Sequence, residues 1–439
     1  MAKRTGKKRK GGNKSGKIHY AKLHRAGAAA AGGRDGNRQQ RAAAATPPRP
    51  AHGFNRLDAD TATPSTVIGL QPLAPIIVRS GRPFDAVTGV DAARFPPPST
   101  LAGCLRTACA EHSGEAYGPQ LADISVAGPL LIRTPAGQPP QWLVPKPADA
   151  TYFHVDNTLR CLRAAPTAWP AGAGGDLPAG LAPVMLQQAV EGKAAAGPQW
   201  WSWDDLLAFR SGAALTVEQL QRGGWTPSSG DRRTHVAIDR QTGAAEAARL
   251  YQTEGLDLES DNAALTSGNT AELQFLARCG RALPAGLVHL GGERRLARVT
   301  PLAESAWPAP PADWWTRCIA SGGLTLTLLT PALFTEGFRP AWLDANLCGA
   351  PPTAPDLRLQ LVAAAVERCE PHSGWDLASQ EPRATRRLAP AGAVYWFKLL
   401  DTPNAAQLAQ LWLASISDCA RDRCDGYGLA LPASWTPCV

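Results

Sequence analysis

The chain alternates between short apolar runs and breaks rich in glycine and proline, a pattern that predicts many short strands and few helices. Strand-like runs lie at residues 67–73, 76–78, 130–132, 142–144 and 394–397. At residues 324–328, Leu and Thr alternate with the period of two that is typical of a strand with one buried face. Residues 271–281 and 287–290 bracket a Pro/Gly turn.

A helix is predicted directly after a block of three prolines. Residues 96–98 are all proline and stop any preceding element. Apolar side chains over residues 101–109 then repeat with helical spacing. We expect Ser99 or Thr100 to be the N-cap of this helix, because hydroxyl side chains accept hydrogen bonds from free backbone N–H groups.

Two more helices are predicted downstream. Ser202 is suited to cap a helix that begins at the end of the tryptophan-rich run 200–203, whose rings favour core packing over a base-stacking platform. Residues 407–419 have an amphipathic pattern and predict the other helix. Residues 128–200 are expected to hold loops and insertions. Strands and helices in two successive halves predict an α+β fold.

Charge separates a basic tail from the rest of the chain. The 439 residues have a formal net charge of +8, but residues 1–50 contain 14 Lys and Arg and one acidic residue. The remaining residues hold 31 basic and 36 acidic side chains, a net charge of −5. We expect residues 1–64 to be disordered, and net charge alone gives no argument that the body binds RNA.

Several classes of protein are excluded by composition. The most apolar stretch, residues 318–334, contains a proline, glycines and hydroxyls and is a poor membrane span. No apolar segment follows the N-terminal charges, so a secretory signal is not predicted and a cytoplasmic location is expected. The ten cysteines are then expected to be free thiols, and their C-x4-C spacings are wider than most zinc sites use.

The predicted helix after the prolines has a start that suits RNA. Its free N–H groups, together with Ser99 and Thr100, are able to donate to phosphate oxygens. Gly103 allows another backbone to approach closely, and Arg106 lies two turns from the cap, within reach of a phosphate. The competing interpretation is an ordinary capped helix in which Arg106 forms a surface ion pair.

A glycine–arginine turn is the second RNA-binding candidate. Gly291 and Gly292 permit positive φ and bring backbone amides near a ligand, while Arg294 and Arg295 add positive charge. The alternative is a hairpin turn with a salt bridge from Glu293 to one of the arginines.

Three further places have weaker signals. Gly426, Tyr427 and Gly428 form either a flexible loop with a base-stacking ring or a tight turn. His235 is more typical of a satisfied loop histidine than of a general acid or base, since no partner is marked by spacing.

Arg79 and Arg82 flank Gly81 in a loop after the first strands and form a candidate contact for single-stranded RNA. Phe84 fits either that contact or the core. No phosphate-binding loop, nucleophile elbow, zinc-protease or paired-carboxylate metal pattern is found, which supports a protein without cofactor, metal or catalytic residues.

Taken in series, these segments resemble a family of CRISPR RAMP proteins, the third subunit of the type III-B (Cmr) effector complex. The resemblance rests on residues 68–75, 79–84, 95–106, 235–251, 290–295, 329–334, 391–395 and 426–428. It leaves out residues 1–64 and gives no support over about 165–200.

The resemblance implies two tandem ferredoxin-like (RRM-like) domains with loop and hairpin insertions, at residues 65–260 and 261–439. It implies a non-catalytic subunit that helps hold the 5′ handle of the crRNA, beside the large polymerase-like subunit and a backbone RAMP subunit, and that meets target RNA only indirectly. The residues near His235 resemble an arm or hairpin of the family. Two alternatives remain open: a metal-independent endoribonuclease that processes crRNA, and the equivalent subunit of another type III complex.

Overall fold

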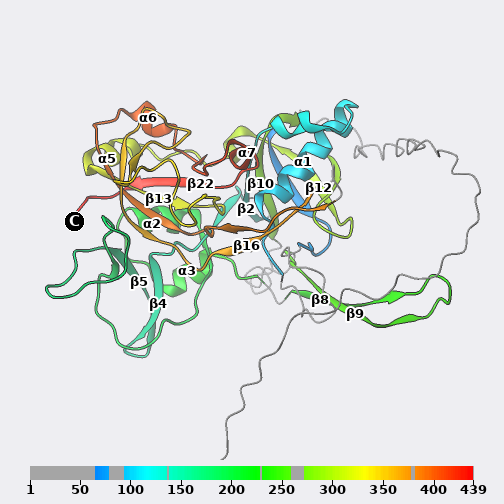
Figure 1. The fold of residues 1–439 in the computed structure, drawn as a ribbon, viewed down its shortest axis with the longest axis horizontal. Coiled ribbons are helices and arrows are strands. Elements are labelled where there is room, and N and C mark those ends of the chain that lie inside the picture. The colour runs from blue at the N-terminus through cyan, green and yellow to red at the C-terminus, as the bar shows by residue number, and fades with distance from the viewer. Residues whose placement is uncertain are drawn as a thin grey trace, which may run out of the picture. The chain divides into compact units, whose positions relative to one another are not determined.

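This computed structural model describes residues 65–78, 93–135, 138–227, 230–258, 271–376 and 381–438 (Figure 1). Residues 51–439 form one unit, to which all described residues belong. The predictions for residues 1–64, and those for Arg79, Arg82 and Phe84, lie outside the described residues. No helix in the described part of the chain is long and apolar enough to cross a membrane.

An antiparallel sheet of seven strands forms the first half of the fold, in the order β11-β12-β1-β10-β2-β3-β7. Its strands are β1 (Ser65–Pro72), β2 (Val126–Pro135), β3 (Gln141–Pro145), β7 (Trp200–Ser202), β10 (Ala271–Leu283), β11 (Gly286–His289) and β12 (Leu296–Leu302). Both faces are covered, because Ile68 and Leu70 pack with helix α1 (Pro98–Ser113) whereas Val67 joins a second cluster on the other side. The sheet confirms the strands predicted near residues 67, 130 and 142.

The second sheet has six strands in the order β14-β15-β20-β13-β22-β21. They are β13 (Gly323–Leu328), β14 (Cys348–Gly349), β15 (Leu359–Ala365), β20 (Val394–Leu399), β21 (Ala414–Ser415) and β22 (Leu429–Ser434). All six residues of β13 are buried, so the expectation of one buried face was wrong. The reason is that Thr325 lies beside Trp396 in the sheet, and Val184 and Trp435 pack against the cluster that contains Trp396, on a face the sequence assigns to solvent.

Smaller elements extend these sheets. A three-stranded sheet contains β4 (Ala150–Val155), β5 (Thr158–Pro166) and β6 (Val184–Leu186). Two-stranded ribbons pair β8 (Asp231–Ile238) with β9 (Ala245–Gly255), β16 (Glu370–His372) with β19 (Arg386–Leu388), and β17 (Trp375–Asp376) with β18 (Glu381–Pro382). Figure 1 shows the β8–β9 ribbon projecting away from both sheets.

The helices are short apart from α1. They are α2 (Trp203–Arg210), α3 (Val217–Gly223), α5 (Trp314–Ser321), α6 (Ala405–Ala409) and α7 (Ala420–Cys424), with 3-10 turns at Pro119–Asp123 and Glu304–Ala306. Ser202 caps α2 as expected, since its hydroxyl accepts the N–H of Asp205. The N-cap of α1 is instead Pro97, which offers no side-chain cap.

The helix predicted over residues 407–419 is wrong. The chain leaves α6 after Ala409 and then forms β21, which pairs with β22. Leu413 has a φ of 49°, outside the range of a right-handed helix. Main-chain hydrogen bonds to the sheet therefore replace those of the expected helix.

The expected domain boundary at residue 260 does not separate the two sheets. Strands β10, β11 and β12 follow that position and yet belong to the first sheet, because β1 pairs with both β10 and β12. The second sheet begins only with β13, so the chain passes between the sheets after Leu302.

A buried ion pair joins the two sheets. Arg106 on α1 contacts Asp425, which lies just before β22, and both side chains are almost fully buried. The same guanidinium donates to the carbonyl oxygens of Ile124, at 2.9 and 3.0 Å, and of Cys424, at 3.1 Å. Every bond of this side chain is therefore made inside the protein.

Breaking this pair should destabilise the whole chain. Arg106→Met removes the buried charge partner of Asp425 and leaves only the half-exposed Arg421, at 3.5 Å. The loss of one partner of a buried pair costs about 3–5 kcal/mol. Denaturant unfolding measures the change. As a control, Glu115→Gln in the exposed Glu115–Arg281 pair should leave the unfolding free energy nearly unchanged; equal losses in both variants would contradict the assignment.

Candidate nucleic-acid interface

The start of α1 packs against the loop that precedes β22. The Ser99 hydroxyl lies 2.9 Å from the Tyr427 hydroxyl and 3.4 Å from Nε2 of His372. The structure thus brings together two segments that are more than three hundred residues apart in the sequence. Tyr427 therefore contacts the first turn of α1, where the sequence predicts that a phosphate binds.

The residues of the loop around Tyr427 are explained by packing inside the protein. Tyr427 is 2% exposed and packs with Leu333 and Leu388, and burial raises its pKa to about 12. Gly426 has a φ of 92°, and a Cβ there would lie 2.6 Å from the carbonyl oxygen of Gly128. The loop is therefore a tight turn packed against β2, and its ring is not available for stacking on a base without local rearrangement.

Arginines surround His372 at this junction. Burial, together with the charges of Arg386, Arg94 and Arg383, lowers the pKa of His372 to about 4. Arg386 forms a bidentate pair with Asp422, at 2.5 and 2.7 Å. The ring is consequently neutral at physiological pH, and the local electrostatic field favours an anion.

These arginines were absent from the sequence predictions. The only signal available was the run Arg383-x-x-Arg386-Arg387 shortly before the segment 391–395. Such a run is more often a solvated face, and only the β16–β19 pairing carries it to the start of α1.

Gly103 differs from the other candidate glycines. It is exposed on α1, and a Cβ added there would meet no atom within 4 Å. A glycine inside a helix is less stable than alanine by about 0.5–1 kcal/mol. Nothing in the described part of the chain accounts for that cost, so the open position is suited to close approach by another molecule. Thr100 is partly exposed in the preceding turn.

The glycine–arginine turn lies on the segment that follows β1. The N–H of Gly292 donates to the carbonyl of Ile77 at 2.7 Å, and a Cβ on Gly291 would lie 2.8 Å from the same oxygen. Arg295 pairs with Glu293 at 3.1 Å, as the hairpin interpretation anticipated. The exposed guanidinium of Arg294 has no partner among the described residues.

The β8–β9 ribbon brings aromatic groups to the same turn. His235 stacks on Tyr251 with ring centroids 5.0 Å apart, and its Nε2 lies 2.8 Å from the Thr253 hydroxyl and 4.0 Å from the Glu293 carboxylate. Next to His235 along β8, the side chains of Arg232 and Arg233 are 60% and 48% exposed. Positive charge and stacked rings therefore meet at one place.

The candidate residues thus fall into two groups. The first joins α1 to the turn before β22; it contains Ser99, Thr100, Gly103, Arg106, Gly426, Tyr427 and Gly428. The second is at the surface and contains His235, Gly291, Gly292, Arg294 and Arg295. Of the first group, Arg106 and Tyr427 are buried, whereas Gly103 is exposed.

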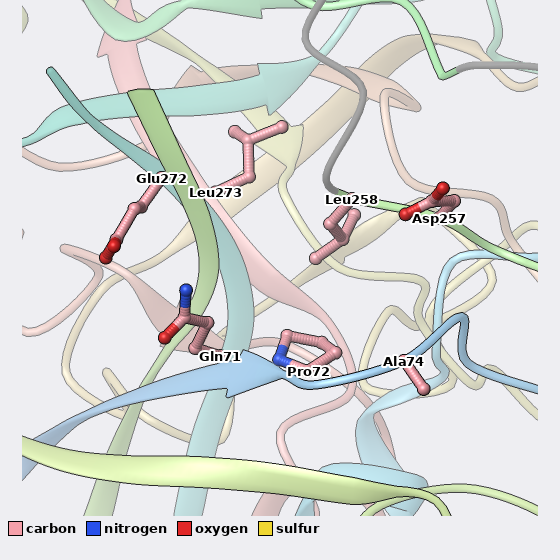
Figure 2. Close-up of a pocket in the computed structure, with 7 residues that line it drawn as sticks. All are labelled: Gln71, Pro72, Ala74, Asp257, Leu258, Glu272 and Leu273. Carbon is pink, nitrogen blue, oxygen red and sulfur yellow. The ribbon is translucent and has the colours of Figure 1, made fainter. Parts of the chain in front are cut away.

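A cavity of about 180 Å³ lies between the end of β1 and the start of β10. Figure 2 shows its two acidic residues, Asp257 and Glu272, on opposite sides. None of its lining residues is basic. Since two carboxylates repel a phosphate, this cavity does not belong to the interface.

Residues 68–435 match the model of the family described as CRISPR-associated protein (Cas_Cmr3). The chain belongs to this Cmr3 family. No protein with a curated description matches the sequence. The family match covers both sheets and both groups of candidate residues, and confirms the resemblance seen in the sequence.

Solved structures with similar chains are distant. A chain in a cryo-EM structure of the type III-B Cmr-beta complex, bound to cognate target RNA and AMPPnP, is 14% identical with a TM-score of 0.41; the match covers 75% of this chain and 86% of that chain. A chain in a crystal structure of the Csm3–Csm4 subcomplex of the type III-A interference complex is 9% identical with a TM-score of 0.33, over 84% and 99% of the two chains.

The neutral state of His372 predicts a pH dependence of stability. In the unfolded chain histidine binds a proton near pH 6.5, whereas the folded pKa is about 4, so the unfolding free energy falls as pH drops through this window. Relative to His372→Gln, the wild type should lose about 1–2 kcal/mol between pH 7 and pH 5.

Denaturant unfolding of both proteins at these pH values measures the difference, and the comparison cancels carboxyl groups common to both. Parallel pH profiles for the two proteins would show that His372 is solvated and protonates normally.

Proposed function

We propose that this Cmr3-family chain is a non-catalytic, crRNA-binding subunit of a type III-B CRISPR effector complex that acts in antiviral defence in the cytoplasm. It helps to cap the 5′ handle of the crRNA and bridges the large polymerase-like subunit to a backbone RAMP subunit. Each sheet with its helices corresponds, in this proposal, to one of two tandem ferredoxin-like domains.

One observation carries the proposal: the exposed Arg294 guanidinium lies in a glycine turn beside the stacked rings of His235 and Tyr251. Single-stranded RNA is bound by basic grooves that follow its phosphates and by aromatic rings that stack on its bases. On the adjoining strand the guanidiniums of Arg232 and Arg233 are also exposed, each paired with one carboxylate, that of Glu254 and that of Asp231. The turn and the ribbon together supply both kinds of contact.

A catalytic role has less support. Cleavage of RNA without a metal needs an accessible general base and a proton donor next to the phosphate. His372 is neutral and near the Tyr427 hydroxyl, but Tyr427 is buried in the junction. His235 is occupied by Thr253. Cleavage of repeat RNA by the purified chain, abolished by His235→Ala, would support the endoribonuclease alternative instead.

Removing the side chain of Arg294 should weaken RNA binding. Arg294→Ala is expected to cost about 1–3 kcal/mol of binding free energy to a handle-sequence RNA, the range for a hydrogen bond to a charged group. Fluorescence anisotropy at fixed salt measures the affinity. Arg358→Ala, which removes an exposed arginine in the second half of the chain, is the matched control.

The salt dependence sharpens this test, because loss of one phosphate contact should lower the slope of log affinity against log salt by about one. Equal affinities for Arg294→Ala and Arg358→Ala would refute the assignment of the turn.

Gly103→Ala should change stability and binding in opposite directions. The added methyl group meets nothing in the described chain, so the unfolding free energy should rise by about 0.5–1 kcal/mol. If RNA or a neighbouring subunit packs against this position, assembly of the complex should weaken. Denaturant unfolding and co-purification with crRNA test the two halves; a more stable variant that assembles normally would show that Gly103 contacts nothing.

A further inference from the structure

A second cavity lies at the base of the β8–β9 ribbon, and none of the residues that line it belongs to the turn of Arg294. Its volume is about 250 Å³, below the range of about 300–1,000 Å³ that is usual for drug-sized ligands. It is lined by Ala93, Phe95, Trp200, Trp225, Pro227, Gly230, Glu254 and Leu256. A cavity of this size has room for one planar ring system rather than for an extended chain.

Three aromatic rings form its apolar part. Phe95 and Trp200 have ring centroids 4.6 Å apart at an angle of 42°, and Trp200 meets Trp225 edge-on at 5.6 Å. A backbone hydrogen bond from Trp225 to the carbonyl of Trp200, at 3.1 Å, holds the two tryptophans together at the edge of the first sheet. Such walls suit a flat, polarisable ligand.

Two polar groups give the cavity chemical selectivity. The indole N–H of Trp225 is buried and has no partner in the described residues, although buried donors are nearly always hydrogen-bonded. Glu254 supplies a carboxylate, which Arg232 orients by donating to Oε2 at 3.3 Å. A ligand that fits must therefore donate to a carboxylate, and a ligand that also satisfied the indole N–H would have to accept a hydrogen bond from it.

The cavity is also lined by Gly230, which leaves room for the side chain of Glu254. A Cβ on Gly230 would lie 2.6 Å from Cγ of Glu254 and 3.0 Å from Cβ of Ala93. Any larger residue would press on the Glu254 side chain, so Gly230 keeps the carboxylate in place at the cavity wall.

We propose that this cavity binds the base of an unpaired guanine. Guanine donates from N1–H and from its 2-amino group, which match the two oxygens of one carboxylate. Its O6 and N7 are acceptors able to satisfy the indole N–H of Trp225. Adenine and cytosine have an amino donor without the adjacent N–H, and uracil has a single N–H, so none of them makes the paired contact.

The inference rests on the proposed function, since the ribbon that carries Glu254 also carries the RNA-binding candidate His235. The same chemistry would accept the base of a free guanine nucleotide. The experiment therefore has an RNA arm and a nucleotide arm.

Anisotropy titrations of the full chain would compare uridine oligomers that contain a single central guanosine, inosine, adenosine or uridine. Guanosine should bind about tenfold more tightly than inosine, which lacks the 2-amino donor, because tenfold corresponds to one charge-assisted hydrogen bond. Adenosine should resemble uridine. Ratios between oligomers cancel the non-specific contribution of the basic tail.

Glu254→Gln should reduce the guanosine preference to twofold or less and leave the affinity for the uridine oligomer unchanged. Glu218→Gln removes an equal charge from an exposed position on α3 and should retain the preference. Trp225→Phe keeps a ring but removes the donor and should also lower the preference. Thermal melts of each variant identify any loss of folding.

The outcomes separate the two proposals. Binding of all oligomers without a guanosine preference overturns the pocket and leaves the proposed function intact. No binding of any RNA, with Glu254-dependent binding of GMP by calorimetry, contradicts the proposed function and assigns the pocket to free nucleotide. Failure of both RNA and GMP to bind overturns both.

Discussion

The fold depends on the guanidinium of Arg106. This side chain comes from the helix that covers the first sheet and bonds to Asp425 and to two carbonyl groups, one of which belongs to the approach to β22. A buried arginine needs every donor satisfied, because an unpaired charge in the interior is strongly unfavourable. The two sheets are therefore held at one position, and the turn before β22 must follow the start of α1.

This constraint explains why the turn with Gly426 and Tyr427 has the residues it has. Gly426 is pressed against the backbone of β2, and Tyr427 reaches back to the hydroxyl of Ser99. Gly426 and Tyr427, which resemble an RNA-binding loop in the sequence, thus hold the two sheets together in the structure. The surface available to a ligand lies elsewhere, at the turn of Arg294 and along the β8–β9 ribbon.

Charge in this protein is local rather than global. Outside residues 1–50 the chain has a net charge of −5, yet arginines gather around His372 and along β8. Because fields at a surface are dominated by the nearest charges when salt screens the rest, an acidic body is compatible with a basic binding face. The acidic cavity at the end of β1 and the aromatic cavity beside Glu254 show the same local character.

The sequence by itself determined the family, the predominance of strands, the helix after the prolines and the cap of α2, because short-range patterns and turn chemistry specify these features. It also singled out the glycine–arginine turn and His235. Only the tertiary structure decided that Arg106 is buried, that residues 271–302 complete the first sheet, and that residues 414–415 form a strand. The first two outcomes depend on partners far away in the sequence, and residues 414–415 form a strand because they pair with β22. The local preference of a segment yields when tertiary hydrogen bonds and burial outweigh it.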